Sequence, residues 1–212
     1  VKVWQISTGS CIKTLTGHTS DVTSVAIAGD VVVSGSLDFT VKVWQISTGS
    51  CIKTLTGHGN LVASVAIAGD VVVSGSFDYK VKVWQISTGS CIKTLTGHTY
   101  DVTSVAIAGD VVVSGSYDST VKVWQISTGS CIKTLTGHTY EVESVAIAGD
   151  VVVSGSMAEE VVSGSEAEEV VSGSEAEDST VKVWQISTGS CIKTLTGHTS
   201  DVTSVAIAGD VV

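Results

Sequence analysis

One unit of about 40 residues is written five times along this chain. The stretch VKVWQISTGSCIKTLTGH occurs without a change at five places, beginning at Val1, Val41, Val81, Val121 and Val181. A period of this length with no helical segment inside it predicts an array of small stacked sheets rather than one ordinary globular domain. Any specific function must therefore be read from the positions at which the copies differ.

The composition excludes several classes of protein. Of the 212 residues 43% are hydrophobic and 15% are charged, which indicates a folded chain rather than a disordered one. No apolar stretch is long enough to cross a bilayer, so we expect no membrane partner. The basic residues are 11 Lys with no Arg, and the net charge is -10. Because phosphate contacts need a basic face, we also expect no nucleic-acid partner.

Each unit carries one cysteine at the same place. These are Cys11, Cys51, Cys91, Cys131 and Cys191. Single cysteines at this spacing match neither a disulfide framework nor a zinc site. We interpret them as small buried strand residues of a protein in a reducing compartment, which predicts a cytoplasmic location.

Within a unit the sequence predicts four short strands, at residues 22–28, 31–36, 41–46 and 51–56 in the first complete copy. Gly, Asp, Ser and Thr in the intervening turns indicate an antiparallel meander. The first three strands are apolar on both faces and the fourth is more polar. This pattern indicates sheets that stack face to face, with the more polar fourth strand outermost and exposed to solvent. It therefore predicts an all-β propeller of four-stranded antiparallel blades.

The linked motifs Gly-His, Ser-Gly-Ser-x-Asp and Val-Lys-Val-Trp in every unit resemble the WD-repeat propellers, although Gln follows each Trp where the family name has Asp. The resemblance implies a buried hydrogen-bond chain in each blade that joins the His, a Ser hydroxyl, the turn Asp and the Trp ring nitrogen. By position the four sets are His18, Ser34, Asp38 and Trp44; His58, Ser74, Asp78 and Trp84; His98, Ser114, Asp118 and Trp124; and His138, Ser154, Asp178 and Trp184. Whether the first or the second Ser of Ser-Gly-Ser serves is open at this point.

We expect residues 1–212 to form a single propeller domain of about five blades. Four whole blades are predicted at 19–58, 59–98, 99–138 and 139–198, the last with an insertion at 157–177. A closing blade would combine 199–212 with 1–18, but it lacks its Ser-Gly-Ser and its Asp. A closed five-blade ring, an excerpt of a larger ring and a ring completed by another chain all remain open. The incomplete blade also predicts a route to self-association.

The copies differ in two short windows, one before the first strand and one in the turn between the second and third strands. In an antiparallel meander both windows lie at the same end of the sheet, so one rim of the ring is variable and the opposite rim is uniform. All the Tyr and Phe residues of the chain fall in these windows, and aromatic side chains are enriched in binding hot spots. We therefore predict a partner-binding rim made of Ser20, Asp21, Leu37, Phe39, Asn60, Leu61, Phe77, Tyr79, Lys80, Tyr100, Tyr117, Tyr140, Glu141 and Glu143.

The insertion at 157–177 lengthens the same kind of turn and is strongly acidic. It is either an acidic arm for a basic partner or a flexible loop produced by slippage duplication, and both interpretations stay open.

Two hypotheses for the function follow. The first is a non-catalytic scaffold that recognises a protein or peptide through the variable rim; it resembles the WD-repeat sensor regions of fungal and bacterial immunity receptors. The alternative is an engineered or recently duplicated scaffold with no dedicated partner. We expect no enzymatic activity, no cofactor and no metal site, because the sequence contains no nucleophile and base pair, phosphate loop or clustered ligand set.

Overall fold

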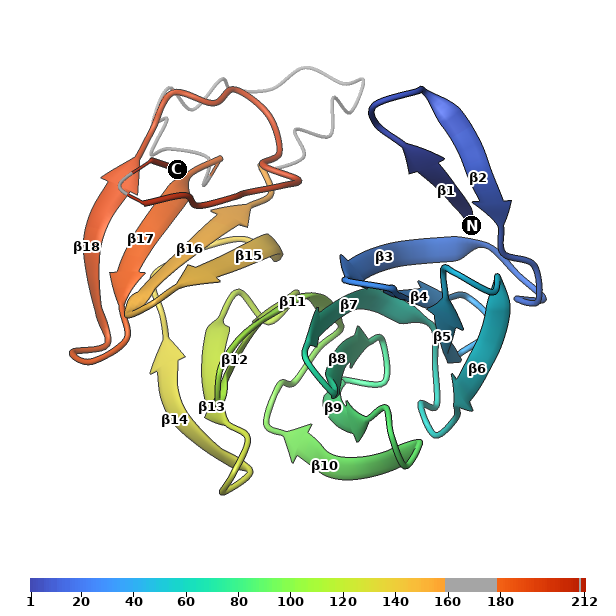
Figure 1. Ribbon diagram of the computed structural model, residues 1–212. Helices are drawn as coiled ribbons and strands as arrows, with labels where there is room; N and C mark the ends of the chain where they lie inside the picture. The colour runs from blue at the N-terminus through green and yellow to red at the C-terminus, as the bar shows by residue number, and fades with distance from the viewer. Residues whose placement is uncertain (159–178, 210) are drawn as a thin grey trace, which may run out of the picture.

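The computed structural model describes residues 1–158, 179–209 and 211–212, and it consists of antiparallel sheets arranged around an open ring (Figure 1). Four sheets have four strands each, in the sequential order of a meander, and a fifth has two strands. This confirms the predicted all-β propeller architecture. In the described part of the chain no helix could cross a membrane.

The two-stranded sheet comprises β1 (Lys2–Gln5) and β2 (Ser10–Thr14). The first blade comprises β3 (Val22–Ala28), β4 (Val31–Ser36), β5 (Val41–Gln45) and β6 (Ser50–Leu55). The second comprises β7 (Val62–Ala68), β8 (Val71–Ser76), β9 (Lys80–Gln85) and β10 (Ser90–Thr96). The third comprises β11 (Val102–Ala108), β12 (Val111–Ser116), β13 (Val121–Gln125) and β14 (Ser130–Leu135). The fourth comprises β15 (Val142–Ala148), β16 (Val151–Ser156), β17 (Val181–Gln185) and β18 (Ser190–Leu195).

Successive blades pack face to face, as the apolar faces of their first three strands require. Val33 and Val43 of the first blade join Val62, Val65 and Trp84 of the second in one buried cluster, and the next two junctions repeat it. Each junction is also tied by a hydrogen bond from a backbone amide to a Ser hydroxyl of the preceding blade, such as the 3.1 Å bond from Val65 N to Ser24 Oγ. The core of the protein is thus a series of equivalent layers between blades.

The fourth strand of each blade lies at the outside of the ring (Figure 1). In the first blade a β-bulge interrupts the pairing of this strand, β6, with the third strand, β5. In the first blade Val43 pairs with Lys53 and Trp44 pairs with Cys51, so Ile52 is the extra residue. All five cysteines are exposed and free, so the expectation that they are buried is wrong. Because the outer strand has no neighbour beyond it, and the bulge interrupts its alternation, the residues around Cys51 face solvent on both sides.

The ring is open between its two ends (Figure 1). Residues 201–207 lie against the fourth blade in the manner of an innermost strand, with Val205 N donating to Ser144 Oγ over 3.0 Å. The strands β1 and β2 pair only with each other, and Leu15, just after β2, packs against Val32 and Trp44 of the first blade. The combination of 199–212 with 1–18 as a closing blade therefore stays a prediction.

The insertion at 157–177 lies outside the described residues except for its first two positions. The backbone amide of Met157 donates to Glu141 O over 2.9 Å, and that of Ala158 donates to a carboxylate oxygen of Asp201 over 2.8 Å. The loop therefore leaves the fourth blade at the same rim as the variable windows.

Candidate functional site

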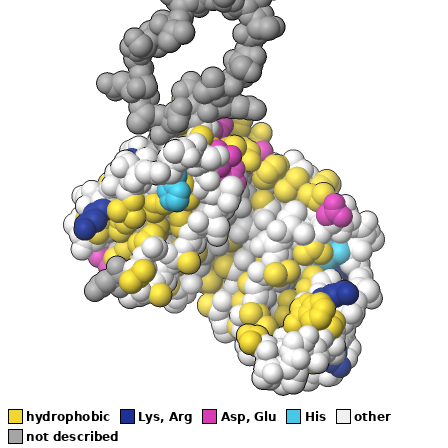
Figure 2. Space-filling view, turned by 90° about the horizontal axis from the view of Figure 1, so that it is seen from above, with side chains coloured by type: hydrophobic (Ala, Val, Ile, Leu, Met, Phe, Trp, Pro, Cys, Tyr) yellow, Lys and Arg dark blue, Asp and Glu magenta, His cyan; other side chains and the backbone are white. Residues whose placement is uncertain are grey.

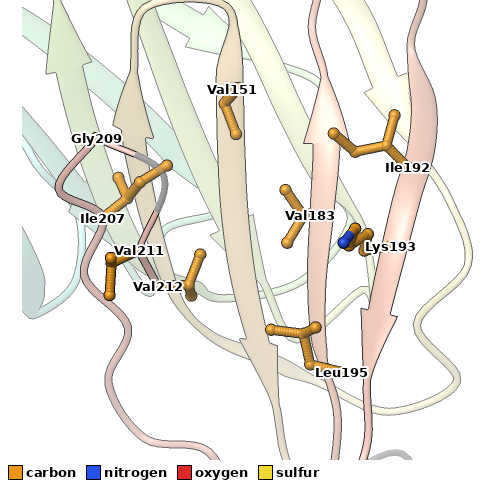
Figure 3. A pocket seen from close by; sticks show the side chains of 9 residues that line it. All are labelled: Val151, Val183, Ile192, Lys193, Leu195, Ile207, Gly209, Val211 and Val212. Atoms are coloured by element: carbon orange, nitrogen blue, oxygen red, sulfur yellow. The ribbon is translucent and has the colours of Figure 1, made fainter.

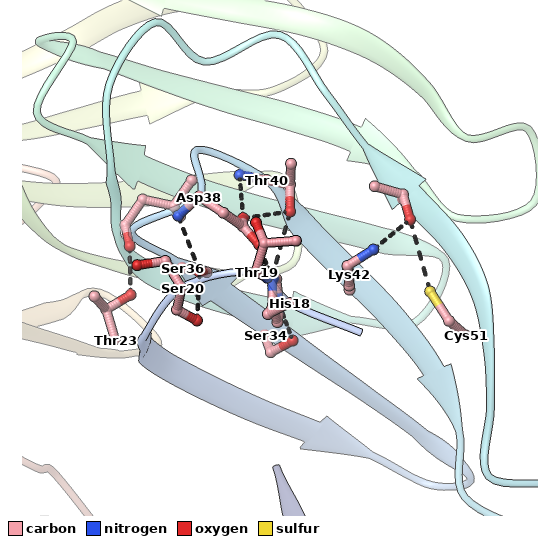
Figure 4. A network of polar contacts seen from close by, with 12 residues as sticks. His18, Thr19, Ser20, Thr23, Ser34, Ser36, Asp38, Thr40, Lys42 and Cys51 are labelled. Atoms are coloured by element: carbon pink, nitrogen blue, oxygen red, sulfur yellow. Dashed lines mark hydrogen bonds and ion pairs between the residues drawn. The ribbon is translucent and has the colours of Figure 1, made fainter. Parts of the chain in front are cut away.

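A hydrogen-bond chain crosses the first blade just beneath the variable rim, and Figure 4 shows its His18, Ser34 and Asp38 members. In the first blade His18 Nδ1 lies 2.8 Å from Asp38 Oδ2, His18 Nε2 lies 2.7 Å from Ser34 Oγ, and Trp44 Nε1 donates to Ser34 Oγ over 2.8 Å. The Asp carboxylate can only accept, so His18 Nδ1 carries a proton, and the Ser34 hydroxyl completes the chain by donating to Nε2. The first Ser of Ser-Gly-Ser is thus the member of this chain, which settles the choice left open by the sequence.

The second Ser of Ser-Gly-Ser holds the turn instead. Ser36 Oγ donates to Ser20 O over 3.3 Å and accepts the backbone N–H of Asp38 over 3.0 Å. The Asp38 carboxylate in turn accepts the backbone N–H groups of Thr19 and Thr40. Both variable windows therefore form hydrogen bonds with the invariant residues Ser36 and Asp38.

The second and third blades repeat the chain with His58, Ser74, Asp78 and Trp84, and with His98, Ser114, Asp118 and Trp124. In the fourth blade His138 Nε2 lies 2.7 Å from Ser154 Oγ, and Trp184 Nε1 donates to Ser154 Oγ over 2.8 Å. Asp178, the predicted fourth member, lies outside the described residues.

These aspartates are held in their ionised form. At Asp78, burial raises the pKa, but hydrogen bonds from the His58 ring and from the backbone amides of Gly59 and Lys80 outweigh it and lower the pKa to about 2. The pKa values of Asp38 and Asp118 are lowered in the same way. In the second blade the ionised carboxylate of Asp78 accepts hydrogen bonds from Gly59 and Lys80 and so connects the two variable windows.

The two variable windows lie side by side at the rim. The backbone amide of Leu37 donates to Asp21 O over 2.9 Å, and Asn60 Nδ2 donates to Phe77 O over 3.3 Å. Of the predicted rim residues, seven are exposed: Ser20, Asp21, Leu37, Phe39, Asn60, Tyr79 and Tyr100. The others are half-buried: Leu61, Phe77, Lys80, Tyr117, Tyr140, Glu141 and Glu143.

Aromatic pairs connect the second and third blades at the rim. The ring centroids of Phe77 and Tyr117 are 5.9 Å apart, and those of Tyr79 and Tyr100 are 6.1 Å apart. Both pairs have tilted planes and lie within the range of attractive aromatic contacts. The sequence predicted these four residues as part of the rim but not their pairing, which joins different blades. We call Phe77, Tyr79, Tyr100 and Tyr117 the aromatic cluster.

The rim turns contain unusual backbone conformations. Phe39 and Tyr79 both have a φ of 68°, and Ser119 at the corresponding position has a φ of 61°. This left-handed region is unfavourable for side chains other than Gly, Asn and Asp, and such outliers concentrate at functional sites. The turn thus displays two aromatic residues where Gly or Asn would be less strained.

A cavity of about 300 Å³ opens among the inner strands at this rim. Every residue that lines it occupies a variable position of the repeat. These residues are Thr23, Leu37, Leu61, Ala63, Phe77, Thr103, Tyr117 and Glu143. Sequence reasoning missed Thr23, Ala63 and Thr103, although their variation at the start of each inner strand was a signal for them.

One polar pair faces this cavity. Tyr117 and Glu143 both line it, and their side chains interact electrostatically. Burial, followed by the charge of Glu143, raises the pKa of Tyr117 to about 12. Burial raises the pKa of Glu143, and the charges of Asp201 and Glu141 add to this effect. Tyr117 is therefore a neutral phenol, and Glu143 is the one residue of the lining that can carry a negative charge.

The uniform rim has a structural reason for its uniformity. Asp30 accepts the backbone N–H of Ser47 over 2.8 Å and also its hydroxyl, and these bonds lower the pKa of Asp30. The same pair recurs in the second, third and fourth blades. The turns of the uniform rim are thus the same in every copy because their side chains form these hydrogen bonds. Uniformity of one rim is therefore no sign that the other binds a partner, and the features that indicate binding at the variable rim are its aromatic cluster and its cavity.

The comparisons with known proteins agree with this architecture. The family model "WD domain, G-beta repeat" matches residues 9–45, 49–85, 89–125, 129–185 and 189–210. No curated protein sequence matches the chain. Among solved structures, the computationally designed Ika4 protein is 37% identical with a TM-score of 0.70, over 84% of this chain and 99% of its own. The computationally designed Ika8 protein is 34% identical with a TM-score of 0.73, over 99% of this chain and 72% of its own.

Both solved structures are of designed proteins, which agrees with the alternative hypothesis of an engineered or duplicated scaffold without favouring it over recognition. The repeats of the matching family model cover the chain from residue 9 to residue 210, with short gaps between them. The family typically provides scaffolds for protein interaction. With blades, hydrogen-bond chains and repeat motifs in agreement, the chain belongs to the WD domain, G-beta repeat family.

Proposed function

We propose that the protein is a non-catalytic recognition module that binds a protein or peptide through its variable rim. The observation that supports this proposal most strongly is that every residue lining the rim cavity lies at a position where the copies differ. The adjacent aromatic cluster supplies large and rigid side chains of the kind that dominate binding energy. The invariant hydrogen-bond chains beneath the rim hold these side chains in place before a ligand arrives.

Peptides selected from a random display library with the immobilised 212-residue protein test this proposal. The double variant Tyr79→Ser, Tyr100→Ser is expected to weaken binding of the selected peptides about tenfold or more. Ser stands at the corresponding positions of other copies, as Ser119 and Ser20, so the variant should keep the fold.

The control variant is Thr88→Ala, which changes an exposed turn of the same blade at the uniform rim. It should bind the peptides as the unaltered protein does. Equal binding by the double variant and the unaltered protein, or failure to select any peptide, would count against rim recognition.

We also propose that residues 1–18 and 199–212 come together as the closing blade. A cavity of about 500 Å³ lies between the fourth blade and the segment that contains Ile207 and Val211 (Figure 3). At the complete junction of the first two blades, the corresponding space is filled by Trp84 and Ile86. Their counterparts at the start of the chain, Trp4 and Ile6, are 56% and 101% exposed.

The first blade is uncovered in a complementary way. Val25 is 56% exposed and Ile27 is 63% exposed, whereas Val65 at the equivalent position of the second blade is 6% exposed. Figure 2 looks onto this side of the ring and shows hydrophobic side chains gathered on it. We propose that the exposed faces of the first and fourth blades are covered when β1 pairs with 201–212. The pairing takes place within one chain or between two copies, and the second case is self-association.

Light scattering together with thermal unfolding tests the closing blade. Replacement of Trp4 by Ala is expected to lower either the assembled mass or the melting temperature, because Trp4 would be buried in the completed blade. The control is Ile12→Ala, since Ile12 is exposed and so are its counterparts in complete blades, such as Ile52. If the unaltered protein has the mass of one chain, the closing blade forms within one chain. If it has the mass of two or more chains, the closing blade forms between copies. If Trp4→Ala changes neither the mass nor the melting temperature, the closing blade does not form.

We further propose that the protein works in a reducing, intracellular compartment. Five exposed and unpaired cysteine thiols support this, because such thiols oxidise or cross-link in secreted proteins. A thiol titration of protein isolated from its native source should find all five reduced, and disulfide-linked species would contradict the proposal.

A further inference from the structure

The rim cavity combines apolar walls with a single half-buried carboxylate. Leu37, Leu61, Ala63 and Phe77 contribute hydrocarbon and aromatic surface, and Glu143 contributes the only charged side chain of the lining. Glu143 is present in one copy only, because the corresponding positions hold Thr or Ala.

The two threonine hydroxyls of the lining are already engaged. Thr23 Oγ1 donates to Val62 O, and Thr103 Oγ1 donates to Val142 O and to Gly115 O, in each case across or along the inner strands. Each hydroxyl thus uses its single O–H group to donate to the backbone. A ligand in the cavity therefore meets one carboxylate that accepts hydrogen bonds and no free donor from these threonines.

The surroundings reinforce the negative potential. Asp201, Glu141 and Asp101 act electrostatically on Glu143 or Tyr117, and every one of them is acidic. Lys80 is the only cation among the variable positions of the sequence. An anionic ligand would be repelled here, and a wholly apolar ligand would desolvate the Glu143 carboxylate without supplying an opposite charge, which is costly.

We propose that this cavity binds the side chain of a Lys or Arg residue of a peptide, with its cationic head on Glu143 and its methylene stem against Phe77 and the aliphatic walls. Long cationic side chains pair an apolar stem with a charged tip, which matches the distribution of polarity in the cavity. The aromatic face of Phe77 adds attraction for a cation. This inference rests on the proposed rim recognition and names the chemistry that it would read.

The test is an NMR titration of the full chain, observed at the methyl groups of Ala63 and Leu61. The probes are Nα-acetyl-lysine amide, Nα-acetyl-arginine amide and the uncharged isostere Nα-acetyl-norleucine amide. At least one cationic probe is expected to shift these methyl signals, while the norleucine amide binds about tenfold more weakly or not at all. Glu143→Gln, which keeps the shape of the side chain, should weaken the cationic probe about tenfold.

The control is Thr88→Ala, which changes an exposed residue of the uniform rim that does not line the cavity. It is expected to leave the affinity for the cationic probe unchanged. Equal binding of the norleucine and lysine amides, equal binding by Glu143→Gln and the unaltered protein, or no shift with any probe would each overturn the inference. If the display-selected peptides still depend on Tyr79 and Tyr100 in that event, rim recognition stands and only the cationic ligand is wrong.

Discussion

Replacement of Ser114 by Ala is expected to lower the free energy of unfolding by about 3 kcal/mol, although only one oxygen atom is removed. Ser114 is fully buried, and its hydroxyl accepts from Trp124 Nε1 over 2.9 Å and lies 2.7 Å from His98 Nε2. Without it the Trp124 donor and the His98 acceptor are both buried and unpaired. Each such group costs about 1–3 kcal/mol.

Thermal unfolding measures this loss as a decrease in melting temperature of roughly 10 °C. Hydrogen exchange should locate it in the third blade, because blades of a repeat array are stabilised mainly by themselves and their neighbours. Ser130→Ala is the control, since Ser130 is exposed at the start of β14. If Ser114→Ala were as stable as Ser130→Ala, the hydrogen-bond chain would not support the rim.

The second large effect is expected from Gly75→Ala, at the close approach between the second and third blades. A Cβ atom at Gly75 would lie 2.7 Å from Val102 Cγ1 and 2.9 Å from Val105 Cγ1. Both valines are buried in the junction, so the blades must separate or the side chains must leave their preferred rotamers. Overpacking of this kind costs about 2 kcal/mol.

Urea unfolding of Gly75→Ala checks this value, with Gly59→Ala as its control. A Cβ atom at Gly59 would meet Asp78 Cβ at 3.8 Å, an ordinary contact, and other copies carry Thr at that position. The control should be close to the unaltered protein in stability. Equal stability of the two variants would mean that the junction has more room than the structure shows.

The local structure was predictable because the repeat carries strong local signals. The strands expected at 22–28 and 31–36 are observed at Val22–Ala28 and Val31–Ser36, and those expected at 41–46 and 51–56 are observed at Val41–Gln45 and Ser50–Leu55. Short apolar runs bounded by turn residues set these limits. The bulge at Ile52 was not predictable, since an extra residue in an outer strand leaves no mark in a simple alternation.

The candidate site was predictable only in part. The variable positions can be aligned from the sequence, and they placed Glu143 and the aromatic residues at the rim. The cavity depends on side chains from four different blades, so it arises from the curvature of the ring, which one repeat does not encode. The pairing of Tyr79 with Tyr100, and the left-handed backbone at Tyr79, likewise depend on the three-dimensional arrangement.

Rim recognition is tested most directly by mapping, with NMR on the 212-residue chain, where a display-selected peptide binds. We expect the largest signal changes on the aromatic cluster and on the methyl groups of Leu61 and Ala63. We expect little change at the Asp30 and Ser47 turns of the uniform rim. Changes centred on those turns, or on the open ends of the ring near Val25 and Ile207, would contradict the assignment of the variable rim as the recognition surface.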